Sequence, residues 1–196
     1  MKNGPILVTA AESNPVTTAE AKTYCLITDS ADDTIIAAFV SAATDYAQRR
    51  LSTQFIQATF KETWDCWPCD GILTLERHPI ASVSSVKYYD TNGTQQTVST
   101  SNYWTDLESR PPRIFPVATY SWPDLQDGRP APIEVRYVAG YAGASSVPAS
   151  ILTAIKALVK HWYDNRAPIL LNGAVPQTIP YSLEQLFYVN DRSGYC

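Results

Sequence analysis

Apolar residues follow a helical period over the stretch that begins at Pro148. They recur every three or four positions, which is the spacing of one buried helix face. The apolar positions are Ile151, Leu152, Ile155, Leu158, Val159, Trp162 and Tyr163. Ala167-Pro168 ends the pattern, because a proline disfavours helical backbone in the residue before it. The sequence therefore predicts a helix of about five turns that ends near Arg166, and its broad apolar stripe indicates packing within or between subunits.

Two further helices are predicted near the N-terminus. Thr17 and Glu20 have the spacing of a capping box, in which each side chain binds the backbone N–H of the other residue. A short helix follows to about Leu26, and a second begins near Asp32. The apolar face of the second helix carries Ile35, Ile36, Phe39, Val40, Ala43, Tyr46 and Ala47. We expect these two helices to form an antiparallel hairpin.

The middle of the chain, residues 55–139, is predicted to be β-structure. Short alternating stretches are separated by turn residues, which indicates an antiparallel sheet or a small barrel. Asn92-Gly93 suits a tight hairpin turn, because both residues tolerate positive φ. In the first stretch Ala58, Phe60 and Trp64 share one side with Glu62, which does not fit an apolar row. The expected strands lie at about 58–64, 72–76, 83–90, 103–104, 113–115 and 133–139.

The C-terminal tail carries a second capping-box pattern, at Ser182 to Gln185. It predicts a short helix with Leu183, Leu186 and Phe187 on one face. Burying these three side chains would contribute about 5–8 kcal/mol in total, so the face needs something to cover it. Two interpretations stay open: the tail folds back onto its own domain, or it docks into the groove of a partner protein.

Composition narrows the class of protein. The chain has 196 residues, of which 45% are apolar and 17% charged, so it is globular and forms one large domain or one domain with an inserted subdomain. A net charge of −4 argues against a broad basic surface that grips nucleic-acid phosphates. The sequence has no run of about twenty apolar residues and no signal-peptide core at its start. We therefore expect no membrane span, and synthesis in the cytoplasm.

Candidate catalytic chemistry is sparse. Cys66 and Cys69 form a Cys-x-x-Cys pair, but they lie between predicted strands and beside Asp65 and Asp70, whose negative charges disfavour a reactive thiolate. We interpret the pair as part of a turn. Zinc would need two further ligands, and the other cysteines and the two histidines have no paired spacing. No nucleophile motif accompanies the histidines either. We expect no metal, no cofactor and no catalytic residue.

Four of the five tryptophans fall in the β region, at Trp64, Trp67, Trp104 and Trp122. Such residues commonly fill the core and the edges of a small sheet. They would also suit a platform on which sugars or bases stack. The second interpretation keeps a carbohydrate- or peptide-binding module open as the alternative function.

An ordered series of segments resembles the head–tail connector (adaptor) proteins of tailed bacteriophages, a family also found in gene-transfer particles. No single segment is diagnostic, and the resemblance rests on their order and spacing. Cys66 to Cys69 and the final Gly194-Tyr195-Cys196 match no pattern of that family. The matching segments are residues 15–22 (PVTTAEAK), 32–51, 78–83 (HPIASV), 86–90 (VKYYD), 135–141 (VRYVAGY) and 147–166.

The resemblance implies an α+β fold, in which a helical bundle carries an inserted antiparallel β subdomain and an extended C-terminal tail. The corresponding regions are 1–54 (N-terminal helical hairpin), 55–146 (β-rich insertion), 147–166 (long helix that completes the bundle) and 167–196 (tail with a short amphipathic helix). Side chains that would pack the bundle are Ile36, Phe39, Val40, Ile151, Ile155, Leu158 and Trp162.

The resemblance also implies a function without catalysis: a structural neck protein of a virion. Copies would form a ring, typically a dodecamer, that joins the portal protein to a tail-side neck or stopper protein. DNA would pass through the ring without specific binding, and an acidic chain fits this because it forms few contacts with phosphates. The portal-facing element of such proteins is usually the C-terminal segment. It maps here onto Tyr181, Leu183, Leu186, Phe187 and Tyr188.

Overall fold

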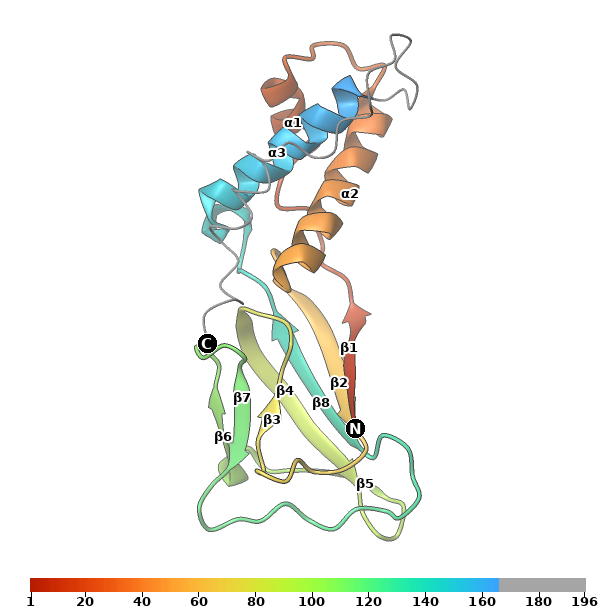
Figure 1. Ribbon diagram of the computed structural model, residues 1–196, viewed down its shortest axis with the longest axis vertical. Coiled ribbons are helices and arrows are strands. Elements are labelled where there is room, and N and C mark those ends of the chain that lie inside the picture. The colour runs from red at the N-terminus through yellow and green to blue at the C-terminus, as the bar shows by residue number, and fades with distance from the viewer. Residues whose placement is uncertain (166–196) are drawn as a thin grey trace, which may run out of the picture. The chain divides into compact units, whose positions relative to one another are not determined.

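The computed structural model describes residues 1–165, which belong to two compact units, one of β-strands and one of helices (Figure 1). Met1–Glu12 and Ile56–Ala142 make up the β unit. Ser13–Phe55 and, within the described residues, 143–165 make up the helical unit. The α+β fold class expected from the sequence is confirmed. The predicted tail, residues 167–196, lies outside the described residues.

The described part of the helical unit contains α1 (Thr18–Cys25), α2 (Asp33–Leu51) and α3 (Ala149–Asp164), and each contacts the other two. The predicted capping box is present at the start of α1. Thr17 Oγ1 accepts the N–H of Glu20 at 3.2 Å, and the Glu20 carboxylate accepts the N–H of Thr17 at 2.8 Å. These bonds lower the pKa of Glu20 and satisfy donors that a helix start leaves free.

Antiparallel strands form two sheets in the β unit. The first sheet has the order β1-β2-β8-β4-β5, and its strands are β1 (Lys2–Thr9), β2 (Ala58–Trp64), β8 (Ile133–Ala139), β4 (Ile80–Tyr89) and β5 (Gln95–Thr97). The second has the order β3-β7-β6, with β3 (Leu73–Thr74), β7 (Arg113–Pro116) and β6 (Tyr103–Asp106). Short 3-10 helices lie at Thr100–Asn102 and Ala144–Ser146.

One apolar core is shared by the two sheets, because side chains from both belong to it. Strands β2 and β8 alternate strictly between buried and half-buried residues, as period-two patterning predicts. They pair in register, with Phe60 opposite Tyr137 and Glu62 opposite Val135. Core residues from the second sheet include Leu73 and Ile114.

Strand β1 is the longest described element that the sequence did not predict. It pairs antiparallel with β2, so Met1–Glu12 cluster with the β unit, whereas the sequence placed residues 1–54 together in a helical hairpin. The pairing slips between Asn3 and Ile6 and again between Leu7 and Thr9. Such bulges remove the period-two signal by which a strand is recognised.

The β4–β5 hairpin differs from expectation in its backbone. Gly93 takes a φ of 78°, but Asn92 keeps a negative φ, so the expectation of positive φ at both residues fails. The carboxylate of Asp90 holds the turn instead. It accepts Nε2 of Gln96 at 2.9 Å and the N–H groups of Thr94 and Asn92 at 2.9 and 3.0 Å. These bonds, led by that from Gln96, lower the pKa of Asp90.

Candidate functional site

Glu62, which did not fit the apolar row of the first predicted strand, lies at the centre of a buried ionic cluster. Its side chain is fully buried. Oε1 accepts the hydroxyl of Tyr137 and the N–H of Glu76, the latter at 2.9 Å. Nζ of Lys2 lies 2.9 Å from Oε2 and 3.2 Å from Oε1 of Glu76. Lys2 therefore neutralises a carboxylate that burial would otherwise make very costly.

The cluster fixes three strands to one another rather than offering a reactive group. Burial, and then the negative charge of Glu62, raise the pKa of Tyr137, so this phenol stays protonated and donates its hydrogen bond. Both carboxylate oxygens of Glu62 are engaged by groups of the chain itself. Because Lys2 belongs to β1, Glu62 to β2 and Tyr137 to β8, the cluster anchors the N-terminal strand on the sheet.

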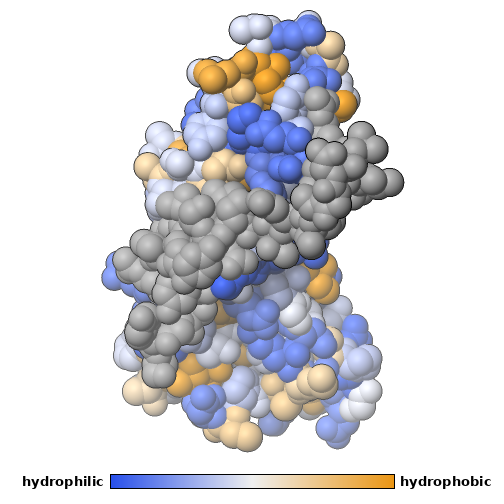
Figure 2. Space-filling view, turned by 45° about the horizontal axis from the view of Figure 1, so that its top comes forward, coloured by the Kyte–Doolittle hydropathy of each residue, from blue (hydrophilic) through white to orange (hydrophobic). Residues whose placement is uncertain are grey.

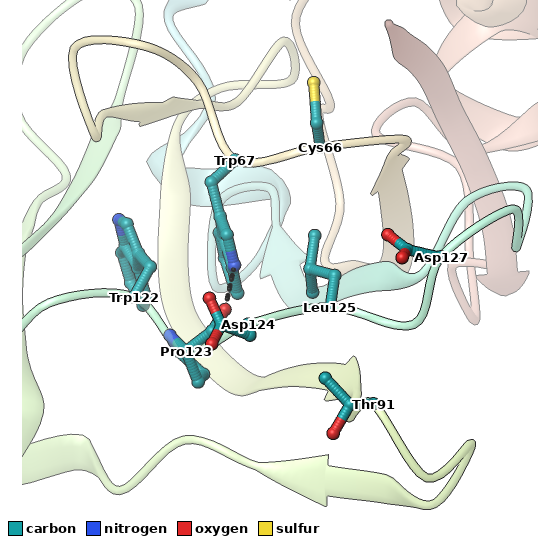
Figure 3. A pocket seen from close by; sticks show the side chains of 8 residues that line it. All are labelled: Cys66, Trp67, Thr91, Trp122, Pro123, Asp124, Leu125 and Asp127. Atoms are coloured by element: carbon teal, nitrogen blue, oxygen red, sulfur yellow. Dashed lines mark hydrogen bonds between the residues drawn. The ribbon is translucent and has the colours of Figure 1, made fainter.

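Two tryptophans that suggested a stacking platform are stacked on each other. The rings of Trp67 and Trp122 lie 4.5 Å apart with an angle of 8° between their planes. The indole N–H of Trp67 donates to the carbonyl of Pro123 at 2.8 Å, as Figure 3 shows, and that of Trp122 donates to the carbonyl of Gly71 at 2.8 Å. Each ring thus uses one face and its polar group within the chain. This favours the packing role over a platform for ligands.

A pocket of about 500 Å³ borders the stack. Figure 3 shows the Asp127 carboxylate well apart from the two indole rings and the Cys66 thiol pointing away from them. The polar groups therefore do not converge on one point, as they would in a specific ligand site. The lining residues are Cys66, Trp67, Thr91, Trp122, Pro123, Asp124, Leu125 and Asp127.

The Cys-x-x-Cys pair lies in the loop between β2 and β3. Cys66 and Cys69 are exposed free thiols. Cys25 is buried, and burial raises the pKa of its thiol. His78 contacts Arg110, with 3.0 Å between Nε2 and Nη1, and His161 lies in α3. Over residues 1–165, His, Cys, Asp and Glu side chains do not gather in groups of three or more that could hold a metal ion.

The side chains expected to pack the helical bundle come together in the helical unit. Phe39 of α2 and Trp162 of α3 are half-buried, and their rings meet edge to face with 6.3 Å between centroids. The five aliphatic members of the set are each at most 3% exposed. They are Ile36, Val40, Ile151, Ile155 and Leu158.

The residues expected to face the portal lie outside the described part of the chain. Their role stays a prediction. They are Tyr181, Leu183, Leu186, Phe187 and Tyr188.

Large apolar side chains are exposed on both units, and space-filling Figure 2 shows apolar areas set among polar ones. In the β unit, Ile6, Leu7 and Val8 follow one another on β1, and Trp104 projects from β6. In the helical unit, Leu26 is 89% exposed just after α1. The β1 group was not predicted from the sequence. Its signal is the run of three apolar residues that follows Pro5.

Comparison with known proteins finds matches among solved structures. No protein-family model and no curated protein matches the chain. A chain in the neck of an empty gene transfer agent (GTA) particle, computed with C6 symmetry, matches with a TM-score of 0.76 and 20% identity, over 95% of this chain and 94% of that chain. The protein has the GTA neck fold.

Two further structures agree with this. A chain of the virion of a native GTA particle matches with a TM-score of 0.76 and 22% identity, over 94% of this chain and 93% of that one. A chain in the neck of a native GTA particle, computed with C12 symmetry, has a TM-score of 0.73 and 20% identity, over 95% and 93%. The shared fold thus extends over nearly the whole of each chain. None of the helices described here has the length and apolar character to cross a membrane.

Proposed function

We propose that this protein is a structural component of a virion neck, a head–tail adaptor whose copies form a ring between the portal and the tail. The match to a GTA neck chain over 95% of this chain and 94% of that one carries the proposal. Since a fold alone does not fix a function, the ordered segments that resemble adaptor proteins add separate support. They were identified from the sequence alone.

Ring formation is supported by the symmetry of the structures that share the fold, which is C6 in one case and C12 in another. We propose a ring of twelve copies. Such a ring closes through a head-to-tail contact that uses two different surfaces of each copy. A contact that is weak between two free copies becomes effective in a ring, because each copy is held by two neighbours at high local concentration.

The ring would continue the DNA channel without binding a DNA sequence. The net charge of −4 supports this, because a protein that neutralises few phosphates releases few counterions and lets DNA slide. The role is mechanical and involves no reaction. Its support is that Glu62, Trp67 and Trp122, which could have served chemistry or ligand binding, are engaged within the chain itself.

The C-terminal segment is proposed to dock on the portal, with a tail-side neck or stopper protein on the opposite side of the ring. Leu183, Leu186 and Phe187 would supply the apolar anchors of a helix in a groove. A chain truncated after Thr178 should lose binding to purified portal. Its far-ultraviolet circular dichroism spectrum should show that the remaining helices are still folded. Equal binding of the full and truncated chains would show that the portal contact lies elsewhere.

Loss of the gene tests the proposed function as a whole. Cells that lack it should accumulate DNA-filled heads and free tails, and a wild-type copy should restore joined particles. Electron microscopy of the lysate distinguishes the two populations. Joined particles in the absence of the gene, or an arrest before DNA enters the head, would contradict an adaptor role.

A further inference from the structure

The outer edge of β1 is an unusual surface for a protein that works alone. β1 is the end strand of its sheet, and on that edge it pairs with no other strand in residues 1–165. Along this end strand Ile6, Leu7 and Val8 are 49%, 53% and 43% exposed, and since Ile6 is in register with Lys61 and Leu7 with Phe60, apolar side chains flank the edge on both faces of the sheet. Exposed edges are normally protected by charges, prolines or bulges. β1 has Pro5 and two bulges, which hinder addition of another strand, yet it keeps three neighbouring apolar side chains.

These side chains are held on a fixed support. Lys2 is anchored to buried Glu62, and the carbonyl of Met1 accepts the N–H of Asp65 at 2.9 Å. Further along, Leu7 is in register with Phe60 of β2. Because the strand is already ordered, little conformational freedom is lost when its outer side chains bind a partner.

A second exposed apolar group lies on the other flank of the same unit. Trp104 of β6 is 57% exposed, while its neighbour Tyr103 points into the core. The ring of Trp104 rests edge-on against Phe115, at 5.9 Å and 75°. β6 is the end strand of the three-stranded sheet, and Figure 1 shows β1 and β6 on opposite sides of the β unit. Tryptophan is among the residues most enriched at the energetic centres of interfaces.

We propose that the β1 flank of one copy binds the Trp104 flank of the next copy, so that β units form the contact between neighbours in a ring. This deepens the proposed neck function and rests on it. The occupant is a second copy because a closed ring needs two different surfaces on opposite sides of one rigid body. β1 and β6 belong to the same compact unit and meet that requirement.

The area involved sets the strength of the contact. At 57% exposure Trp104 offers on the order of 100 Å², and the three β1 side chains together offer roughly twice that. A stable pair of proteins buries about 800 Å² on each partner. The apolar groups therefore form the centre of a contact that is weak for two free copies. The free protein should be monomeric at low micromolar concentration and associate as it approaches millimolar concentration.

Sedimentation velocity of the full chain, from about 10 µM to about 1 mM, tests the inference. Leu7→Asp and Trp104→Ala should each weaken self-association at least about tenfold. Leu26→Asp is the matched control, since it places the same charge at an exposed leucine of the other unit, and should leave association unchanged. Circular dichroism checks that each variant is folded. Wild-type protein that stays monomeric at about 1 mM, or variants that associate like wild type, would overturn the inference.

Mixing the two variants gives the sharper result. Leu7→Asp keeps an intact Trp104 flank, and Trp104→Ala keeps an intact β1 flank. An equimolar mixture should form dimers with one copy of each, and nothing larger, because the second contact is missing on both sides. Absence of mixed dimers would overturn the head-to-tail arrangement. Wild-type association by Trp104→Ala would instead indicate a symmetric β1–β1 contact and would also overturn it.

The same variants separate this inference from the proposed function. Particles that carry the protein in their neck and assemble normally with both Leu7→Asp and Trp104→Ala would refute the contact and leave the neck role intact. Particles that lack the protein altogether would refute the neck role, whatever the free chain does in solution.

Discussion

Replacing Lys2 with methionine tests whether the ionic cluster fixes the N-terminal strand. Methionine keeps most of the apolar stem and removes the ammonium group, so Glu62 loses its positive partner while it stays buried. Its hydrogen bonds from Tyr137 and from the N–H of Glu76 remain. The variant therefore isolates the contribution of one charge.

The structure sets the expected loss of stability in Lys2→Met. Removing one partner of a fully buried ion pair costs about 3–5 kcal/mol. The side chain of Lys2 is 24% exposed and also contacts Glu76, which is half exposed, so water partly screens the pair. We expect the free energy of unfolding of the β unit to fall by about 2–3 kcal/mol, which lowers its Tm by on the order of 10 °C for a unit of this size.

Urea denaturation followed by tryptophan fluorescence measures this loss, because four of the five tryptophans belong to the β unit. The protein should carry no N-terminal tag. Lys61→Met is the matched control. Lys61 lies on β2, is 33% exposed, and pairs with Glu134 at 3.7 Å. Its loss should cost less than about 1 kcal/mol, as is usual for exposed pairs.

Equal effects of Lys2→Met and Lys61→Met would refute the reasoning, because Lys2 would then contribute no more than a surface charge. A change in the urea dependence (the m value) of Lys2→Met would point to fraying of β1 in the folded state rather than to a lost ion pair.

Two other predictions concern side chains outside this cluster. Hydrogen bonds from Ser109 and then from Arg113 lower the pKa of Asp106 from 3.8 to about 2. The ionised Asp106 carboxylate therefore stabilises the fold above its ordinary pKa, and this stabilisation is lost as the pH falls from about 4 to about 2. The urea concentration at the midpoint of unfolding should therefore fall less across that pH range in Asp106→Asn than in wild type. An equal fall in both proteins would contradict the stabilising role of Asp106. In a Cys196→Ser background, a disulfide reagent should label Cys66 and Cys69 rapidly and Cys25 slowly, because Cys25 is buried and the other two are exposed. Equal rates would contradict that burial.

Elements set by local patterns were predictable from the sequence. The capping box at Thr17 and the helical period after Pro148 involve residues within one or two turns of each other, so they can be read along the chain. The alternation in residues 58–64 and 133–139 likewise marked strands whose one side is buried. These segments account for the α+β class.

Features that depend on distant partners were not predictable. Glu62 could be recognised as out of place, but its partner Lys2 lies far away in sequence, on a strand that bulges had disguised. The partner of Trp67 was equally hidden, since Trp122 is distant in the chain and nothing local ties the two together. The candidate interface depends on more than one chain. No sequence pattern ties β1 to Trp104, because their relation arises only when the sheets place them on opposite flanks.

A focused electron-microscopic reconstruction of the neck in particles purified from the source of this protein is the most direct test of the central claim. We expect a ring of copies of this chain between portal and tail, with the β1 flank of each copy against the Trp104 flank of the next. A neck built wholly of other proteins, in particles from which mass spectrometry finds this chain absent, would contradict it.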